Sequence, residues 1–158
     1  MPIYLQIDGI TGDATHETHR QWMDIDAMHW NVSRNINTSV GSAANREASE
    51  PNISEMVLTK VSDSSSTKLF QEACSGKTGK RATIHLVTTG SPGDTYVEYV
   101  LTNSLIANYS VDTSGDRPVE TIRLNFTKVE VKYIPYDEMN NPKSPMIASY
   151  DLPTAKAS

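Results

Sequence analysis

Apolar and polar residues alternate along most of this chain, which is the pattern of half-buried β-strands. The first such segment carries Ile3, Leu5 and Ile7 between Tyr4 and Asp8 and ends at Gly9. Further segments rich in Val, Ile, Tyr and Thr predict strands at residues 22–32, 53–61, 83–89, 95–102, 105–112 and 120–136.

The segment 22–32 has two candidate faces, and alternation alone does not decide which one is buried. One face carries Ile25, Ala27 and His29. The other carries Asp24, Asp26, Met28 and Trp30. In the final segment the alternation slips at Thr127 and Lys128, which indicates a bulge or a bend.

One segment has helical spacing instead. Apolar residues at positions 69, 70, 73 and 74 fall on one helix face, Asp and Ser residues at 63–66 precede them, and Gly76 follows. This pattern predicts a helix over residues 67–75. A mainly β chain with one short helix is expected to form a β-barrel or a sandwich with the helix packed on it.

Two segments show neither pattern. Residues 37–52 are rich in Asn, Ser, Ala and Gly, and we expect a long loop, which is uncommon inside a compact domain and usually functional or disordered. Residues 137–158 contain prolines and few apolar residues. The expected organisation is one domain over residues 1–136 and an irregular C-terminal tail over residues 137–158.

The composition excludes some partners and some stabilising devices. Lys and Arg number 14 against 19 Asp and Glu, and the net charge of -5 argues against a nucleic-acid partner. The single cysteine excludes an intramolecular disulfide. Neither a transmembrane helix nor a Sec signal peptide is expected, since long apolar runs and a basic leader are missing.

No catalytic constellation emerges from the motifs. Gly76-Lys77-Thr78 looks like the end of a phosphate-binding loop, but Gln71 stands where that loop needs glycine and the helix precedes the lysine. Glu98, Glu120 and Glu130 fall in separate strands, with no reason in the sequence to pair as acid and base. We therefore expect no catalytic residues, no cofactor and no enzymatic activity.

The cysteine and the histidines have structural interpretations. Cys74, near a helix C-terminus on the apolar side, is expected to be a small core residue. His16 and His19 lie in a polar stretch without a third metal ligand, so we expect them on the solvated surface, and no metal site. His85 stands alone in a strand.

Four segments match one family in order. Residues 3–7 with Gly9 and Gly12 are similar to its first strand and polar loop, and residues 19–25 (HRQWMDI) are similar to its His-x-x-Trp-Ile-(Asp/Glu)-Val stretch. Residues 58–77 follow its pattern (Phe/Leu)-Thr-Lys-x-x-Asp-x-Ser, short helix, (Cys/Ser)-x-Gly-Lys, and residues 120–133 resemble its terminal strand. The chain thus resembles the Hcp family of type VI secretion tube proteins. It departs from that family at Thr67, where many members have proline, and at Ala14-Thr15, which replace Glu-Ser.

The resemblance implies a β-barrel of two sheets flanked by one short α-helix. It further implies a hexameric ring, and rings that stack into a secreted tube carrying effector proteins in its lumen. The implied partners are further copies of the chain, the effectors, the spike protein and the contractile sheath. The implied route runs from the bacterial cytoplasm through the type VI apparatus.

Interface residues follow from these expectations. We expect the loop with Asn37, Ser42 and Arg46 to reach over a neighbouring subunit or ring, because a long loop without its own core needs a surface to order against. Asp13 is a candidate to face Lys80 and Arg81 across stacked rings. His29 is the candidate lumen-facing residue.

Two other function classes remain open. A monomeric ligand-binding barrel, such as a carbohydrate-binding module, predicts a cluster of exposed aromatic residues among Trp22, Trp30, Tyr96, Tyr99 and Tyr109. A hydrolase on a β scaffold requires Ser, His and a carboxylate to meet in the folded chain.

Overall fold

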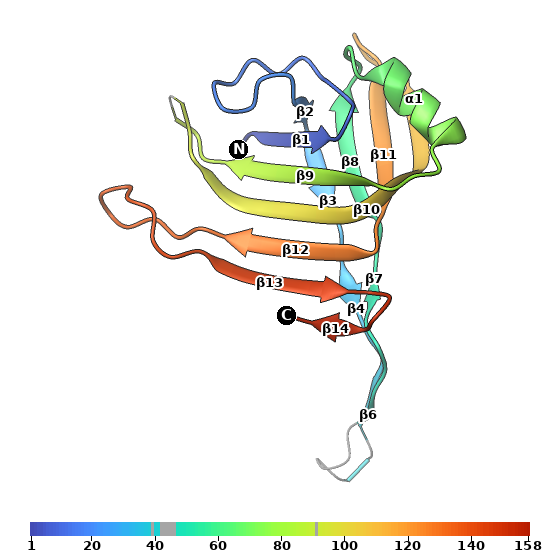
Figure 1. Ribbon diagram of the computed structural model, residues 1–158, viewed down its shortest axis with the longest axis vertical. Coiled ribbons are helices and arrows are strands. Elements are labelled where there is room, and N and C mark those ends of the chain that lie inside the picture. The colour runs from blue at the N-terminus through green and yellow to red at the C-terminus, as the bar shows by residue number, and fades with distance from the viewer. Residues whose placement is uncertain (39, 42–46, 91) are drawn as a thin grey trace.

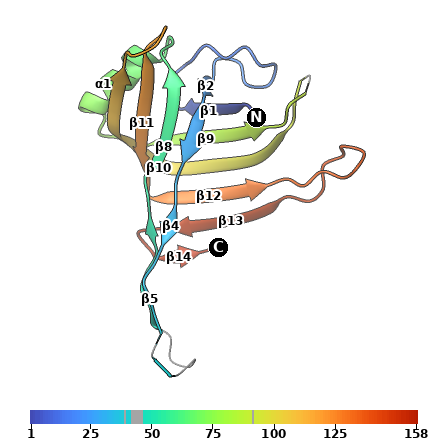
Figure 2. The ribbon, with the colours of Figure 1, turned by 180° about the vertical axis from the view of Figure 1, so that it is seen from behind.

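The computed structural model describes residues 1–38, 40–41, 47–90 and 92–158. Two β-sheets face each other and share one long strand, and a short helix lies at one end (Figures 1 and 2). The mainly β fold with one short helix is confirmed. No helix in the described part of the chain is long and apolar enough to span a membrane.

Sheet A contains the N-terminal strand and both C-terminal strands. Its spatial order is β14 (Lys156–Ala157), β13 (Met146–Asp151), β12 (Lys128–Tyr133), β10 (Thr95–Asp112), β9 (Lys80–Val87), β1 (Ile3–Ile7) and β2 (Met23–Ile25). Sheet B continues from the second half of β10 through β11 (Val119–Asn125) and β8 (Met56–Val61) to β3 (Ala27–His29). The pairings within both sheets are antiparallel.

Two crossings close the barrel. Residues 97–102 of β10 pair with β12 in sheet A, and residues 105–112 pair with β11 in sheet B. Between them Asn103 adopts a left-handed conformation (φ 56°), which turns the strand from one sheet to the other. On the opposite side the chain leaves β2 at the edge of sheet A and enters β3 at the edge of sheet B.

The second crossing corrects the predicted strand over residues 22–32. Ile25 is buried, but after Asp26 the alternation changes phase, so that Ala27 and His29 are exposed while Met28 is half-buried. A single alternating strand cannot describe a segment that changes sheets. The phase slip at residues 127–128 has the same origin, because β11 ends at Asn125 in sheet B and β12 begins in sheet A.

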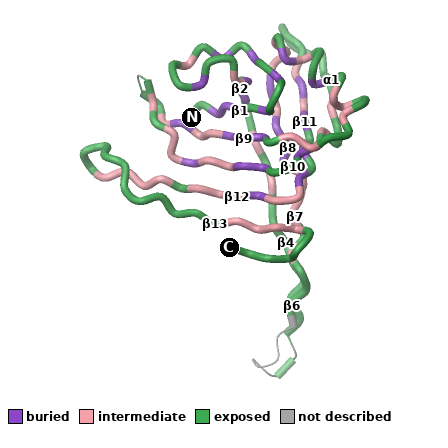
Figure 3. Tube along the Cα trace, in the orientation of Figure 1, coloured by how far each residue is buried: buried purple, intermediate pink, exposed green. Residues whose placement is uncertain are grey.

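The core lies between the two sheets, where alternate side chains of β1, β8, β9 and β11 are buried (Figure 3). Its fully buried members include Leu5, Leu58, Ile84, Ile122 and Leu124. Burying each large apolar side chain contributes roughly 1.5–3 kcal/mol, so the predicted strands that supply this core carry most of the stability of the barrel.

Helix α1 (Ser66–Ser75) agrees closely with the predicted helix over 67–75. Its packing differs from the prediction. Leu69 is the buried residue of the helix, whereas Phe70 is 60% exposed and Cys74 is exposed. The prediction that Cys74 is a core residue is therefore wrong, because the helix touches the barrel along a narrower stripe than its apolar residues span.

The C-terminal tail is also more regular than predicted. β13 pairs with β12 along its whole length, and β14 pairs with β13. The expectation of an irregular tail over residues 137–158 is wrong for these strands. The paired residues Val131 and Ala148 illustrate why: β13 covers an apolar strand that would otherwise be an open edge.

A narrow arm leaves the barrel between β3 and β8 (Figure 1). Its base is the ladder of β4 (Val32–Ser33) with β7 (Asn52–Ile53), and further out β5 (Ile36–Asn37) pairs with β6 (Glu47–Ala48). The predicted loop over residues 37–52 is thus partly a two-stranded ribbon. Ser42 and Arg46, which we expected in its interface, lie outside the described residues.

Candidate assembly surfaces

The arm exposes apolar side chains far from the core. Val32 pairs with Ile53, and Ile36 pairs with Ala48, so each short ladder places two apolar residues directly opposite each other. Val32 is 54% exposed and Ile36 is 44% exposed. An isolated two-stranded ribbon is only marginally stable in water, so the arm is suited to packing against another surface.

An apolar groove of about 240 Å³ lies where the arm meets sheet A. It is lined mainly by side chains of the arm base and of β12 and β13, among them Trp30, Val32, Ile53, Val129, Val131 and Tyr150. Further along β13, Met146 lies on the same face as Ala148 of the groove and is 63% exposed, whereas Ile147 lies on the opposite face of the sheet and is 57% exposed. Apolar surface therefore extends from the arm across the free end of sheet A, the arrangement expected of a protein–protein interface.

The outward face of sheet B carries polar and short apolar residues in two cross-strand rows. His29 lies opposite Val57, which lies opposite Arg123, and Ala27, Thr59 and Thr121 form the parallel row. His29 is exposed on this face. The structure therefore places the predicted lumen residue on an accessible surface of the barrel wall.

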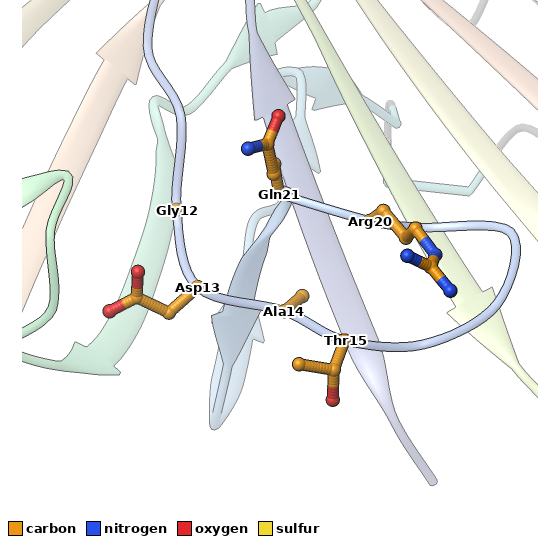
Figure 4. Close-up of a pocket in the computed structure, with 6 residues that line it drawn as sticks. All are labelled: Gly12, Asp13, Ala14, Thr15, Arg20 and Gln21. Carbon is orange, nitrogen blue, oxygen red and sulfur yellow. The ribbon is translucent and has the colours of Figure 1, made fainter.

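The loop between β1 and β2 forms a polar depression of about 610 Å³, lined by Gly12, Asp13, Ala14, Thr15, Arg20 and Gln21 (Figure 4). Asp13 points away from Arg20 and accepts hydrogen bonds from the backbone N–H and hydroxyl of Ser64, which hold its pKa below the usual value. This carboxylate already has a partner within its own chain. Its charge is therefore only partly available for a neighbouring ring.

Lys80 and Arg81, the predicted partners of Asp13, lie on opposite faces of β9. Lys80 donates to Glu72 of α1 across 2.9 Å, with its side chain 27% exposed. Arg81 is exposed on the other face of β9. Among the described residues no ion pair joins Asp13 to either of them, so only a contact between subunits could bring these charges together.

The aromatic residues do not form an exposed platform. All five candidates for a carbohydrate surface are half-buried. Trp30 packs edge-on against Tyr99 with ring centroids 5.7 Å apart, and Tyr109 donates a hydrogen bond to Glu120. These aromatic residues therefore pack against the barrel and do not form a surface on which a carbohydrate could stack.

Two polar clusters with buried members were not predicted from the sequence. His19, expected on the surface, is 2% exposed and lies in a hydrogen-bonded row with His16, His85 and Glu98. Glu120, expected to stand alone, pairs with Lys60 inside the barrel. A cross-strand register would have found His85 with Glu98 and Lys60 with Glu120, but the sequence does not supply that register. Neither cluster has the geometry of a metal site in the described part of the chain.

Comparison with known proteins gives one consistent result. Residues 4–133 match the family model described as "Type VI secretion system effector, Hcp". The chain is 29% identical to Protein hcp1 of Pseudomonas aeruginosa over an alignment of 138 residues, which covers 84% of this chain and 83% of that protein. A solved structure described as a type six secretion system protein superposes with a TM-score of 0.91 at 22% identity, covering 99% of both chains. Hcp1 from Salmonella typhimurium gives a TM-score of 0.78 at 24% identity over 99% of this chain and 98% of that chain.

Proposed function

Because this chain belongs to the Hcp family of type VI secretion system proteins, we propose that it is a structural subunit of the secretion tube that acts by assembly. Six copies form a ring, and rings stack into a tube with a central lumen. The observation that carries this proposal is the arm, whose exposed apolar pairs continue into the apolar groove at the edge of sheet A. This mode of action needs no reacting group.

The arm and groove fit a second copy of the chain. A closed ring requires two different patches on each subunit, one of which contacts the complementary patch of the next copy. The arm with Ile36 supplies a projecting patch, and the groove with Val129 and Val131 supplies a concave one. Asn37 lies in β5 of the arm, and we expect it to contact a neighbouring subunit.

We propose that the outward face of sheet B forms the wall of the lumen. Its row of His29, Val57 and Arg123 offers hydrogen-bonding and short apolar side chains to passing cargo. Within the lumen the tube carries effector proteins. The spike protein and the contractile sheath are its partners in the apparatus, which exports it from the cytoplasm.

The assembly is tested by light scattering and negative-stain imaging of the purified chain. A ring of six 17.4 kDa subunits has a mass of about 104 kDa and a central hole. Ile36→Asp, which puts a charge on the arm, is expected to shift the mass toward the monomer. Met139→Asp is the control, because Met139 is also exposed (81%) but lies in the connection between β12 and β13, outside the arm and the groove.

Each outcome decides between functions. Rings that persist in Ile36→Asp, or that are lost equally in Met139→Asp, contradict the role of the arm. A wild-type chain that stays monomeric at micromolar concentration contradicts the tube and favours the monomeric ligand-binding barrel.

The lumen assignment has its own test. His29→Cys in a Cys74→Ser background provides one thiol for a gold label on assembled rings. Label in the central channel supports the assignment, and label on the outer rim contradicts it. For stacking, Arg81→Glu is expected to shorten tubes at low salt without changing ring mass, since exposed charge pairs contribute about 1 kcal/mol or less. Tubes of unchanged length contradict a role for this charge.

A further inference from the structure

Four polar side chains form a continuous row on the outward face of sheet A. His19 Nδ1 lies 2.9 Å from His16 Nδ1, and His19 Nε2 lies 2.8 Å from His85 Nδ1. His85 Nε2 lies 2.6 Å from a carboxylate oxygen of Glu98. His16 and His19 belong to the loop between β1 and β2, whereas His85 and Glu98 are cross-strand neighbours on β9 and β10.

The row ties the tip of the loop, residues 15–20, to the barrel. Within the described part of the chain, the His19–His85 contact is the only hydrogen bond that joins these residues to a strand. The ring of His19 stacks on Tyr4 with centroids 4.6 Å apart and meets Trp22 edge-on at 4.7 Å. The anchor is therefore a buried imidazole held between two aromatic rings.

Glu98 determines which nitrogens carry protons. A carboxylate only accepts hydrogen bonds, so His85 must donate from Nε2. A neutral His85 then accepts at Nδ1, and His19 donates to it from Nε2. His19 in turn accepts at Nδ1, and His16 donates from its own Nδ1. Each ring therefore donates a hydrogen bond to the next residue in the order His16, His19, His85, Glu98.

The row accommodates one further proton but not two. If His85 becomes positively charged, His19 can reverse its donor and acceptor nitrogens and His16 can accept, so that every contact survives. With a second proton anywhere on the three rings, two N–H groups face each other in one of the nitrogen–nitrogen contacts. The second proton therefore breaks the row.

Several charged and hydroxyl groups lie around the row. Asp24 lies opposite Tyr4 on β2 and is close enough for its charge to interact with His16, while Lys132 lies opposite Glu98 on β12. Glu17 and Arg20 of the same loop are exposed. Thr18 and Thr95 contact His19 and His85 through hydroxyl groups, which can donate or accept.

The environment of His19 favours its neutral form. Burial, followed by the neighbouring His85 and His16, lowers its pKa from 6.5 to about 4. Protonation is therefore resisted while the loop is closed and becomes favourable once His19 reaches water. Acid consequently shifts the equilibrium toward an open loop.

We infer that this row is an acid-sensitive latch, which holds residues 15–20 against β9 at neutral pH and releases them when a second proton binds. Release uncovers Tyr4, Val87 and Trp22, which pack together beneath the loop. The barrel core lies in a separate cluster and stays closed. The latch is a property of the single chain and does not depend on ring assembly.

The test follows acrylamide quenching of Trp22 from about pH 8 to about pH 4 in Trp30→Phe, which leaves Trp22 as the sole tryptophan. Quenching is expected to rise about twofold on release, with the far-UV circular dichroism unchanged. His16→Gln in this background keeps the donor to His19 but cannot take a proton, and it is expected to move the midpoint about one pH unit lower. His29→Gln is the control, since His29 is exposed outside the row.

Three results would overturn the latch. Quenching that stays constant over the whole range shows that the loop does not open. A midpoint unchanged in His16→Gln shows that the second proton does not act through the row. Loss of circular dichroism at the same midpoint shows global unfolding in place of local release. The first and third results need no variant within the row.

Discussion

Lys60 and Glu120 face each other across β8 and β11 inside the barrel, with Nζ 2.8 Å from Oε1 and side chains only 0% and 1% exposed. The ammonium group also donates to Asp63 and to the carbonyl of Val61. Burial alone would raise the pKa of Glu120, but hydrogen bonds from Lys60 and Tyr109 outweigh it and hold that pKa below its usual value. The Glu120 carboxylate is therefore favoured in its charged form, and all three donors of Lys60 Nζ have acceptors.

Removing one partner of this pair is expected to be costly. Lys60→Met leaves the Glu120 carboxylate buried without its cation, which should lower the free energy of unfolding by about 3–5 kcal/mol. The double variant Lys60→Met/Glu120→Leu should recover most of that loss. Urea unfolding measures both, with exposed Lys68→Met as the control. A double variant no more stable than the single one would show that the pair itself stabilises the fold.

Gly79 is expected to tolerate no side chain. A Cβ at this position would lie 2.8 Å from the backbone carbonyl carbon of Asn103, the residue that turns β10 between the sheets. Gly79→Ala should therefore destabilise the chain by about 1–3 kcal/mol.

Gly115→Ala is the matched control, because nothing lies within 4 Å of its Cβ. Thermal unfolding of both variants makes the comparison. Equal melting temperatures for Gly79→Ala and Gly115→Ala would show that the backbone at Asn103 can move to accommodate the methyl group without loss of stability.

Stability should fall with acid in part through His19. Its pKa in the folded chain, about 4 because of burial, lies below the unfolded value of 6.5, so the unfolded chain takes up the proton first. The contribution of neutral His19 to the free energy of unfolding is fully present above about pH 6.5 and is lost as the pH falls toward 4. It amounts to at most about 3 kcal/mol. His19→Gln should flatten the change in urea midpoint between about pH 7.5 and pH 5 relative to wild type. Parallel pH profiles in the two proteins would exclude His19 as a source.

The exposed Cys74 should react completely with a thiol reagent in the folded monomer. The helix presents this residue together with Phe70 to solvent, so no unfolding is needed. The measurement is the rate of labelling with and without urea. A rate that depends on urea would mean that the thiol is covered in solution.

Sequence patterning predicted most strands because period-two alternation reports which residues face a core. It failed at Asp26, where the chain changes sheets, since a change of sheet depends on pairing between distant segments. The burial of His19 and the pairing of β13 with β12 are non-local in the same way. Cys74 was misplaced because spacing defines an apolar helix face but not how much of it the barrel covers.

The arm has a mechanical consequence. Its two strands continue directly into β3 and β8, and β8 is bonded to β11 from Met56 to Val61. Hydrogen bonds between antiparallel strands lie perpendicular to the strands. A pull on the arm therefore loads this ladder in shear, with its bonds bearing tension together instead of parting one after another. Force applied to the arm is thus transmitted to the barrel without separating β8 from β11.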